Sequence, residues 1–260
     1  MVDEYAGFLV VQLHTAGMEL LRAQVLDALW QQCAPLGIYE RSDVGTRRAE
    51  GLHDRPTGLL RGAAPPPLIA IHEHGVRLFV DVYHGQKTGF FLDQRDNRLL
   101  VQRLARGQRL LNCFGYTSAF SAHALRGGAA RTLDVDIAPE GLPAARANLE
   151  ANAPPGAGWD YVVANAFGFV EQLAEHGPRF DVVVVDPPSL LRKQEQLEHA
   201  LGVYTKLNRN ALRLVRSGGL LVSCSCSARV SAEDFFQVVR HAAAGARVRL
   251  RIQWQHAQPA

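Results

Sequence analysis

The 260-residue sequence holds only four cysteines, and this scarcity excludes a disulfide-dense secreted domain. No two cysteines have the C-x-x-C spacing and the histidines do not cluster, so we expect no metal site. A run of about 18 apolar residues, which a membrane-spanning helix requires, does not occur. The opening MVDEYAGFLVVQLH also lacks the basic and long apolar segments of a secretion signal. These absences predict a cytoplasmic protein with reduced cysteines and no membrane partner.

The sequence also lacks a strong excess of charge of either sign, since 28 basic side chains face 25 acidic ones. The formal net charge of +3 permits a polyanionic partner but does not require one. Charged residues make up 20% of the chain and hydrophobic residues 47%, so the chain can bury a sizeable core.

Residues 1–90 predict a small mixed α+β domain. The stretch 5–13, YAGFLVVQL, has the composition of a strand, and 17–32 has the apolar spacing of a helix. The alternating pattern of 65–85 predicts a hairpin, and the many prolines and glycines of 54–67 predict a loop. We interpret this part as a platform that contacts the substrate.

Residues 91–260 predict an α/β domain. Amphipathic helical patterns such as 92–105 and 141–152 alternate with short apolar runs. These runs are 109–114, 131–136, 161–165, 180–188 and 219–225. Continuous apolar strands that alternate with helices indicate a parallel, Rossmann-like sheet covered on both faces. The last segment, 246–254, alternates apolar and basic residues and predicts a half-exposed antiparallel strand.

Polar residues follow the predicted strands at the edge where open α/β sheets bind ligands. Gly115 lies in a tight turn after the first strand, Asp136 ends the second, and Asn165 follows the third. An acidic side chain at this place can accept hydrogen bonds from a ribose. The turn has one glycine rather than G-x-G-x-x-G, which favours a nucleoside cofactor without phosphates. The D-P-P sequence at Asp186 completes a pattern typical of class I S-adenosylmethionine (SAM) methyltransferases.

Several segments resemble the bacterial 23S rRNA large-subunit cytosine-C5 methyltransferases. They are IYERSDVGTRRAEGL (38–52), HGQKTGFFLDQRDNR (84–98), LLNCFGYTSAF (110–120), VVVVDPPSL (182–190) and VSCSCS (222–227). The resemblance covers essentially the whole chain. It implies a Rossmann-like class I methyltransferase sheet with a smaller N-terminal α+β domain, SAM as cofactor, and RNA, namely 23S rRNA, as partner.

Members of that family consist of a PUA RNA-binding domain, a central α+β domain and a C-terminal methyltransferase domain. This chain resembles the last two, so we expect it to be without the PUA domain. Family members also continue into a final strand with an aspartate-histidine-proline motif, and we expect that C-terminal end to be missing here. Without this neighbour, the segment 247–254 would leave an unpaired edge, which favours association such as a homodimer.

The resemblance also assigns a catalytic cysteine. Cytosine C5 is a weak nucleophile, and a thiolate that adds to C6 activates C5 for methylation. Cys226 matches the cysteine of the family, and Asp186 is expected to hold the N3/N4 edge of the base. From the residues alone, a small buried thiol is the simpler explanation for Cys226, and a helix cap is as simple an explanation for Asp186 as a contact with the base. Cys224, Cys113 and Cys33 are interpreted as structural.

The resemblance places a set of residues around the cofactor. They are Phe91, Gln94, Arg95, Phe114, Gly115, Tyr116, Thr117, Asp136, Ile137, Asn165, Ala166, Asp186 and Pro187. Two departures would weaken SAM binding. Ser118 and Ala119 replace two glycines, and Asn165 replaces an aspartate that accepts from the adenine amino group.

Basic residues could form a rim that contacts RNA phosphates. They are Arg41, Arg47, Arg48, Arg55, Arg61, Arg192 and Lys193. For any single one, a solvated surface position is the simpler explanation.

Two other functions remain open. One is a methyltransferase of another base specificity, such as guanine N-methylation, which shares D-P-P and needs no cysteine. The other is a catalytically weakened RNA-binding protein, suggested by Ser118, Ala119 and Asn165.

Overall fold

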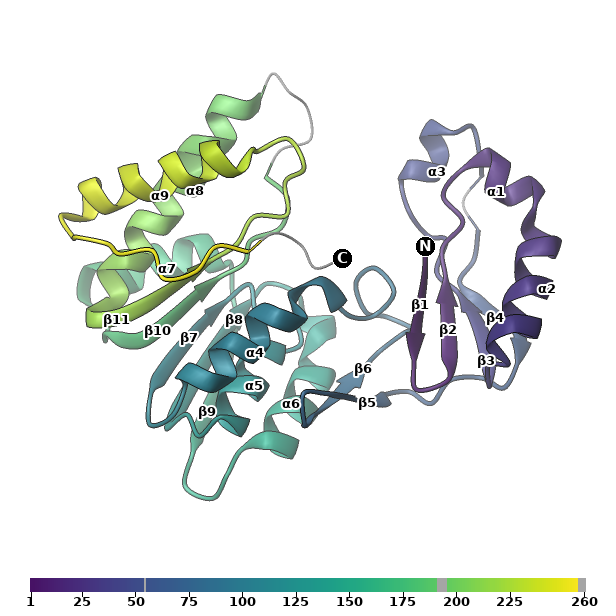
Figure 1. Cartoon of the computed structure of the whole chain (residues 1–260), viewed down its shortest axis with the longest axis horizontal. Coiled ribbons are helices and arrows are strands. Elements are labelled where there is room, and N and C mark those ends of the chain that lie inside the picture. Colours follow the sequence, from purple (N-terminus) through teal and green to yellow (C-terminus); the bar gives the residue numbers. More distant parts are fainter. Residues whose placement is uncertain (54, 191–195, 257–260) are drawn as a thin grey trace. The chain divides into compact units, whose positions relative to one another are not determined.

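The computed structural model describes residues 1–53, 55–190 and 196–256. The chain divides into two compact units, the first ending at Leu92 and the second beginning at Asp93 (Figure 1). Within the described residues, none of the helices is long and apolar enough to cross a membrane.

The first unit is built on a four-stranded sheet of order β1-β2-β3-β4. The strands are β1 (Val2–Tyr5), β2 (Phe8–Val11), β3 (Gly37–Glu40) and β4 (Gly58–Gly62). Helices α1 (Ala16–Leu20) and α2 (Arg22–Cys33) connect β2 to β3, which run parallel. Leucines and Trp30 of α2 pack on Leu9, Val11 and Ile38 of the sheet. The short helix α3 (Thr46–Ala49) follows β3.

The predicted hairpin of this unit is confirmed, because β5 (Ile69–Glu73) and β6 (Val76–Val80) pair antiparallel. Two other predictions are wrong. The predicted loop 54–67 contains β4, since its backbone pairs with β3 although its glycines weaken the strand pattern. The predicted strand 5–13 is interrupted at Ala6-Gly7, whose φ values of 48° and 84° turn the chain back as a hairpin.

The second unit contains a five-stranded sheet of order β11-β10-β7-β8-β9, with every pair parallel. The strands are β7 (Arg109–Cys113), β8 (Arg131–Asp136), β9 (Gly158–Val163), β10 (Phe180–Val185) and β11 (Val215–Ser223). The chain order of the strands reverses between β7 and β10, as in doubly wound folds. This confirms the predicted Rossmann-like α/β class.

Helices cover both faces of this sheet (Figure 1). The helices are α4 (Arg95–Leu104), α5 (Ala119–Arg126), α6 (Leu142–Asn152), α7 (Ala166–His176), α8 (Leu197–Leu214) and α9 (Ala232–Ala246). One-turn helices, η1 (Leu92–Gln94) and η2 (Pro139–Gly141), precede α4 and α6.

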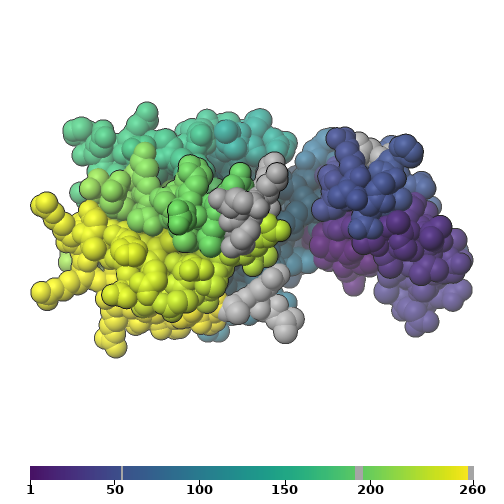
Figure 2. Space-filling view, turned by 90° about the horizontal axis from the view of Figure 1, so that it is seen from above, coloured from purple at the N-terminus to yellow at the C-terminus, as the bar shows by residue number. Residues whose placement is uncertain are grey.

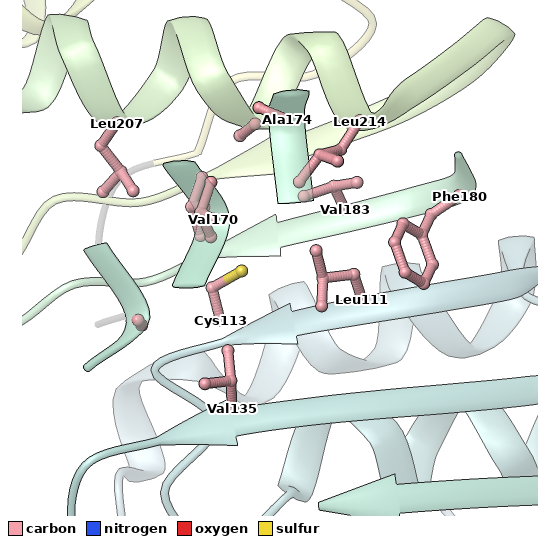
Figure 3. Close-up of a cluster of buried hydrophobic side chains, with 12 residues drawn as sticks. Leu111, Cys113, Val135, Val170, Ala174, Phe180, Val183, Leu207 and Leu214 are labelled. Atoms are coloured by element: carbon pink, nitrogen blue, oxygen red, sulfur yellow. The ribbon is translucent and has the colours of Figure 1, made fainter. Parts of the chain in front are cut away.

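Successive residues of the central strands pack on opposite faces. Leu111 and Val183 pack with α7 and α8 in the cluster of Figure 3, whereas Leu110 and Val182 pack with α4 and α5. Fully burying an aliphatic side chain contributes about 1.5–3 kcal/mol to the free energy of folding. Because helices cover both faces of the sheet, successive residues of a central strand are both buried and are mostly apolar. This burial on both faces is why the sequence pattern located these strands well.

The predicted strand 246–254 is wrong. Helix α9 continues to Ala246, and residues 248–256 form no strand. Leu250, Ile252 and Trp254 are 45%, 54% and 48% exposed. An alternating pattern becomes a strand only where a neighbour accepts its backbone hydrogen bonds, and the described chain pairs no strand with this segment. Figure 2 shows α9 and this segment (yellow) at the surface beside α8 (green).

Candidate active site

Four strands of the second unit end level with one another, which gathers their loops at one edge. Cys113 of β7 is in register with Val135 of β8 and Val185 of β10, and Val185 is in register with Ser223 of β11. Candidate residues predicted from the sequence occupy the segments that follow these strand ends.

The turn after β7 has an unusual backbone. Phe114, Tyr116 and Ser118 have φ values of 62°, 44° and 59°, in the left-handed region that non-glycine residues avoid. A Cβ on Gly115 would lie 2.9 Å from Asp134 Oδ1, so only glycine fits there. Strained backbone of this kind concentrates at ligand-binding turns.

Asp136 braces this turn. Its Oδ2 accepts from the backbone N–H of Tyr116 at 2.9 Å, and its Oδ1 accepts from that of Ala138 at 2.8 Å. Two more side chains hold the turn from outside, because the Tyr161 hydroxyl donates to Tyr116 O and Asn148 Nδ2 donates to Thr117 O. Each Asp136 oxygen keeps a further lone pair for a ligand hydroxyl.

The remaining cofactor candidates of β8 and β9 lie beside the turn or at the start of α7. Ile137 is 65% exposed directly after Asp136. Asn165 caps α7, with its Oδ1 accepting from Phe167 N at 3.0 Å, so part of its acceptor capacity is already used. Ala166 is the buried first residue of α7, and Phe114 packs edge-on against Phe167.

The D-P-P loop and the segment after β11 lie together. Gln94 Nε2 donates to Asp186 Oδ2 at 3.0 Å, and Cys226 Sγ donates to Pro187 O at 3.6 Å. Asp186 is therefore engaged by Gln94 at this edge. The structure brings together four predicted residues: Gln94, Asp186, Pro187 and Cys226.

The two neighbouring cysteines differ in environment. Cys226 is exposed, whereas Cys224 is half-buried, with its Sγ 3.9 Å from Gln94 Oε1. Burial, and then the carboxylate of Asp186, raise the pKa of the Cys224 thiol well above its ordinary value. A reactive cysteine needs an accessible thiolate, so Cys224 is the poorer nucleophile. The sequence predicted Cys224 to be a structural core residue, but the structure places it at the border of this site.

The other two cysteines also differ in burial. Cys113 is fully buried in the core, as predicted, and burial raises the pKa of its thiol (Figure 3). Cys33 is exposed at the end of α2, so its interpretation as structural packing is wrong.

Two further predicted cofactor residues have contacts of their own. Arg95 begins α4 and makes an exposed ion pair with Asp96 at 3.5 Å. Phe91 belongs to the first unit, where Lys87 Nζ lies 4.3 Å from its ring centroid. Their roles at the cofactor stay predictions.

Asp134 was missed by the sequence interpretation. It is fully buried beneath Gly115, and its Oδ1 accepts from Asn112 Nδ2 at 2.7 Å. Burial is the largest cause that raises the pKa of this carboxyl to about 7, with Ser121, Asn112 and Ser118 opposing the rise. The signal was present in the sequence, because LDVD places Asp134 and Asp136 on one face of an otherwise apolar strand.

The predicted basic rim is wrong for its first two members. Arg41 is buried and donates to Val82 O and Gly85 O, and Arg47 is buried against Glu19 and the carbonyl of Leu13. The pKa of Glu19 is lowered to about 2, mainly by its hydrogen bonds with Arg22 and also by the hydrogen bond with Arg47.

Two further rim members are paired at the surface, Arg55 with Glu19 and Arg61 with Asp27. Arg192 and Lys193 lie outside the described residues.

Ser118 provides a prediction about stability. Its φ of 59° lies in the left-handed region, which disfavours a side chain. Ser118→Gly should therefore raise the free energy of unfolding by about 1 kcal/mol. Ala119→Gly, one residue later inside α5, should lower it by about 0.5–1 kcal/mol. Urea denaturation measures both, and a destabilised Ser118→Gly protein would contradict the argument.

Comparisons with known proteins agree with this architecture. Residues 54–251 match a family described as S-adenosylmethionine-dependent methyltransferase. The chain is 39% identical over 242 residues to Ribosomal RNA large subunit methyltransferase I of Escherichia coli O139:H28, covering 93% of this chain and 61% of that protein.

Solved structures are similar as well. The structure of SMU.776 complexed with SAH has a TM-score of 0.78 and 28% identity, covering 93% of this chain and 61% of that one. The structure of the SAM Dependent Methyltransferase from Agrobacterium tumefaciens has a TM-score of 0.70 and 21% identity, and the match covers 93% of this chain and 74% of that one. The chain thus spans less than two thirds of the length of the first relatives, at 61%.

Proposed function

Because the chain belongs to the S-adenosylmethionine-dependent methyltransferase family, we propose that it methylates C5 of a cytosine in 23S rRNA. One observation carries the choice of chemistry. The exposed thiol of Cys226 lies 3.6 Å from the Pro187 carbonyl oxygen, at the strand-end edge that carries the candidate cofactor residues. The name of the Escherichia coli relative supports ribosomal RNA as the substrate.

The residues at this edge fit SAM, which when bound supplies an electrophilic methyl group. Gly115 carries no Cβ, so the turn can lie directly on Asp134 and Asn112 at the end of the sheet, beside Asp136. The spare lone pairs of Asp136 can accept from the two ribose hydroxyls. The exposed side chain of Ile137 offers an apolar surface for the adenine ring. Asn165 retains acceptor capacity for the adenine amino group.

Cys226 would act as the nucleophile that activates the base. Its thiolate forms a bond to C6 of the cytosine, which makes C5 electron-rich. C5 could then take the methyl group of bound SAM, with S-adenosylhomocysteine as the leaving group. Loss of the C5 proton then restores the aromatic ring, and the Sγ–C6 bond breaks to release the thiolate. Asp186, oriented by Gln94, can accept from the exocyclic amino group of the base. A base inside folded RNA must first leave its stack to reach these groups.

We propose that the first unit, which ends at Leu92, serves as the platform for this RNA. Its mixed sheet and buried ion pairs give a rigid surface on which a substrate can be oriented. This role is separable from the chemistry, because the thiol, Asp186 and the turn after β7 all belong to the second unit.

The reaction predicts a covalent intermediate that can be trapped. The protein should transfer label from methyl-labelled SAM to 23S rRNA, with the label recovered in 5-methylcytosine. RNA that contains 5-fluorocytosine should form an adduct stable to denaturing electrophoresis, because fluorine at C5 cannot leave as a proton.

Other outcomes separate the alternatives. Label recovered in a methylated guanine, without an adduct, would replace this proposal by guanine N-methylation. Calorimetry that detects no SAM binding would favour an RNA-binding protein with weakened catalysis.

A further inference from the structure

The serines on either side of Cys226 are tied to one buried hydroxyl. Ser225 Oγ donates to the Tyr204 hydroxyl at 3.1 Å, and Ser227 Oγ lies 3.0 Å from the same oxygen. Ser227 is buried, whereas Cys226 between them is exposed. The hydrogen bonds of the two serines therefore anchor the segment on both sides of the exposed thiol.

Tyr204 is itself held rigidly. It is fully buried in α8, and its ring packs edge-on against Phe235 of α9, with centroids 5.5 Å apart and planes at 87°. Its carbonyl accepts from Asn208 Nδ2 at 2.9 Å, and Asn208 Oδ1 in turn accepts from Ser223 Oγ at 2.6 Å. The end of β11 and the cysteine segment are thus fixed to the same helix.

The same hydroxyl network reaches the loop that follows D-P-P. Ser227 Oγ accepts from Leu190 N at 3.3 Å and lies 3.2 Å from Ser189 Oγ. All contacts are satisfied when Ser225 donates to Tyr204, Tyr204 donates to Ser227, and Ser227 donates to Ser189. Ser227 therefore connects the cysteine segment with the loop that follows Asp186, and the Tyr204 hydroxyl holds this serine in place.

We propose that Tyr204 is a positioning residue for the nucleophile, acting through Ser225 and Ser227 to fix the Sγ of Cys226. The inference rests on the proposed function, since it assumes that this thiol attacks the base. Fixing the backbone on both sides of the cysteine keeps the sulfur beside the Pro187 carbonyl. Misplacing a reacting atom by about 1 Å can reduce a rate roughly 100-fold, so a single hydroxyl can have a large effect.

Tyr204→Phe removes this hydroxyl and keeps the ring that packs on Phe235. The kcat of methyl transfer should fall about 10- to 100-fold, while the KM for SAM stays within about twofold. Thr205→Val is the matched control, because it removes the neighbouring hydroxyl of α8, which donates only to Leu201 O within the helix. Its kcat should equal that of the wild type.

Alkylation by iodoacetamide, followed by peptide mass spectrometry, tests the positioning without any substrate. Tyr204→Phe should raise the alkylation rate of Cys226 about threefold or more relative to Cys33, the exposed reference. Buried Cys113 reports unfolding and should stay protected. General destabilisation would expose Cys113 as well as Cys226. A lower kcat together with faster alkylation of Cys226 and no alkylation of Cys113 therefore indicates a local loss of positioning.

A second variant keeps the test decisive if Tyr204→Phe fails to fold. Ser225 is exposed, so Ser225→Ala should fold and should lower kcat in the same direction. Wild-type kcat and wild-type alkylation of Cys226 in the folded variants would overturn the role of Tyr204. Failure of the proposed function looks different, because the wild-type protein itself would then form no adduct with 5-fluorocytosine RNA.

Discussion

Cys226→Ala should abolish methyl transfer, with kcat reduced by at least about 1,000-fold, because it removes the exposed thiol and leaves only the poorer nucleophile Cys224 near this edge in the described part of the chain. SAM binding should persist, since the turn after β7 and Asp136 do not involve this residue. The adduct with 5-fluorocytosine RNA should disappear at the same time. Labelled-SAM transfer, calorimetry with SAM and denaturing electrophoresis measure the three effects separately.

Cys224→Ala is the matched control two residues earlier. Its thiol is half-buried with a raised pKa, so its removal should leave kcat within about tenfold of the wild type and leave the adduct intact. Transfer that survives in Cys226→Ala would rule out the covalent chemistry. Loss of the adduct in Cys224→Ala alone would move the nucleophile to that cysteine.

Asp134→Asn should stabilise the protein at pH 8 by about 2–4 kcal/mol and change it much less at pH 5. The pKa of the buried carboxyl is raised from 3.8 to about 7, so between these pH values the folded chain holds a proton that the unfolded chain has released. The contribution of this carboxyl to the free energy of unfolding is therefore fully present below about pH 4, and it is lost as the pH rises through 7. Asparagine keeps the Oδ1 that accepts from Asn112 and carries no charge.

Urea denaturation at pH 5 and pH 8 measures this effect. Asp160→Asn is the control, because Asp160 lies on the neighbouring strand β9 with its side chain 50% exposed in an ion pair with Arg131. Its substitution should change stability by less than about 1 kcal/mol at both pH values. Equal effects of Asp134→Asn at pH 5 and pH 8 would show that the carboxyl is already ionised throughout.

The sequence predicted the parts of the fold that a covered parallel sheet requires. Strands β7 and β10 pack apolar side chains on both faces, so their runs are visible without any knowledge of their neighbours. Strand β4 and the segment 246–254 show the limit of this reasoning. Pairing with β3 makes a strand of Gly58–Gly62 despite its glycines, and the alternating segment remains without a paired neighbour in the described chain.

The candidate site was predictable where residues follow strand ends. Gly115, Asp136, Asp186 and Cys226 all occupy such positions, and parallel strands bring these positions to one edge. Tyr204 could not be predicted in this way. Its hydroxyl reaches Ser225 from the middle of α8, and no periodicity specifies a hydrogen bond between a helix interior and a loop so distant in sequence.

Arg41 and Arg47 direct their guanidinium groups into the first unit, toward carbonyl oxygens and carboxylates. A cation that is already neutralised inside the protein cannot displace the ions condensed around a nucleic acid. RNA binding by this unit would therefore release fewer counterions than its count of arginines suggests. The affinity would therefore depend less on salt concentration than the number of arginines predicts, and the shape of the surface would contribute more to recognition.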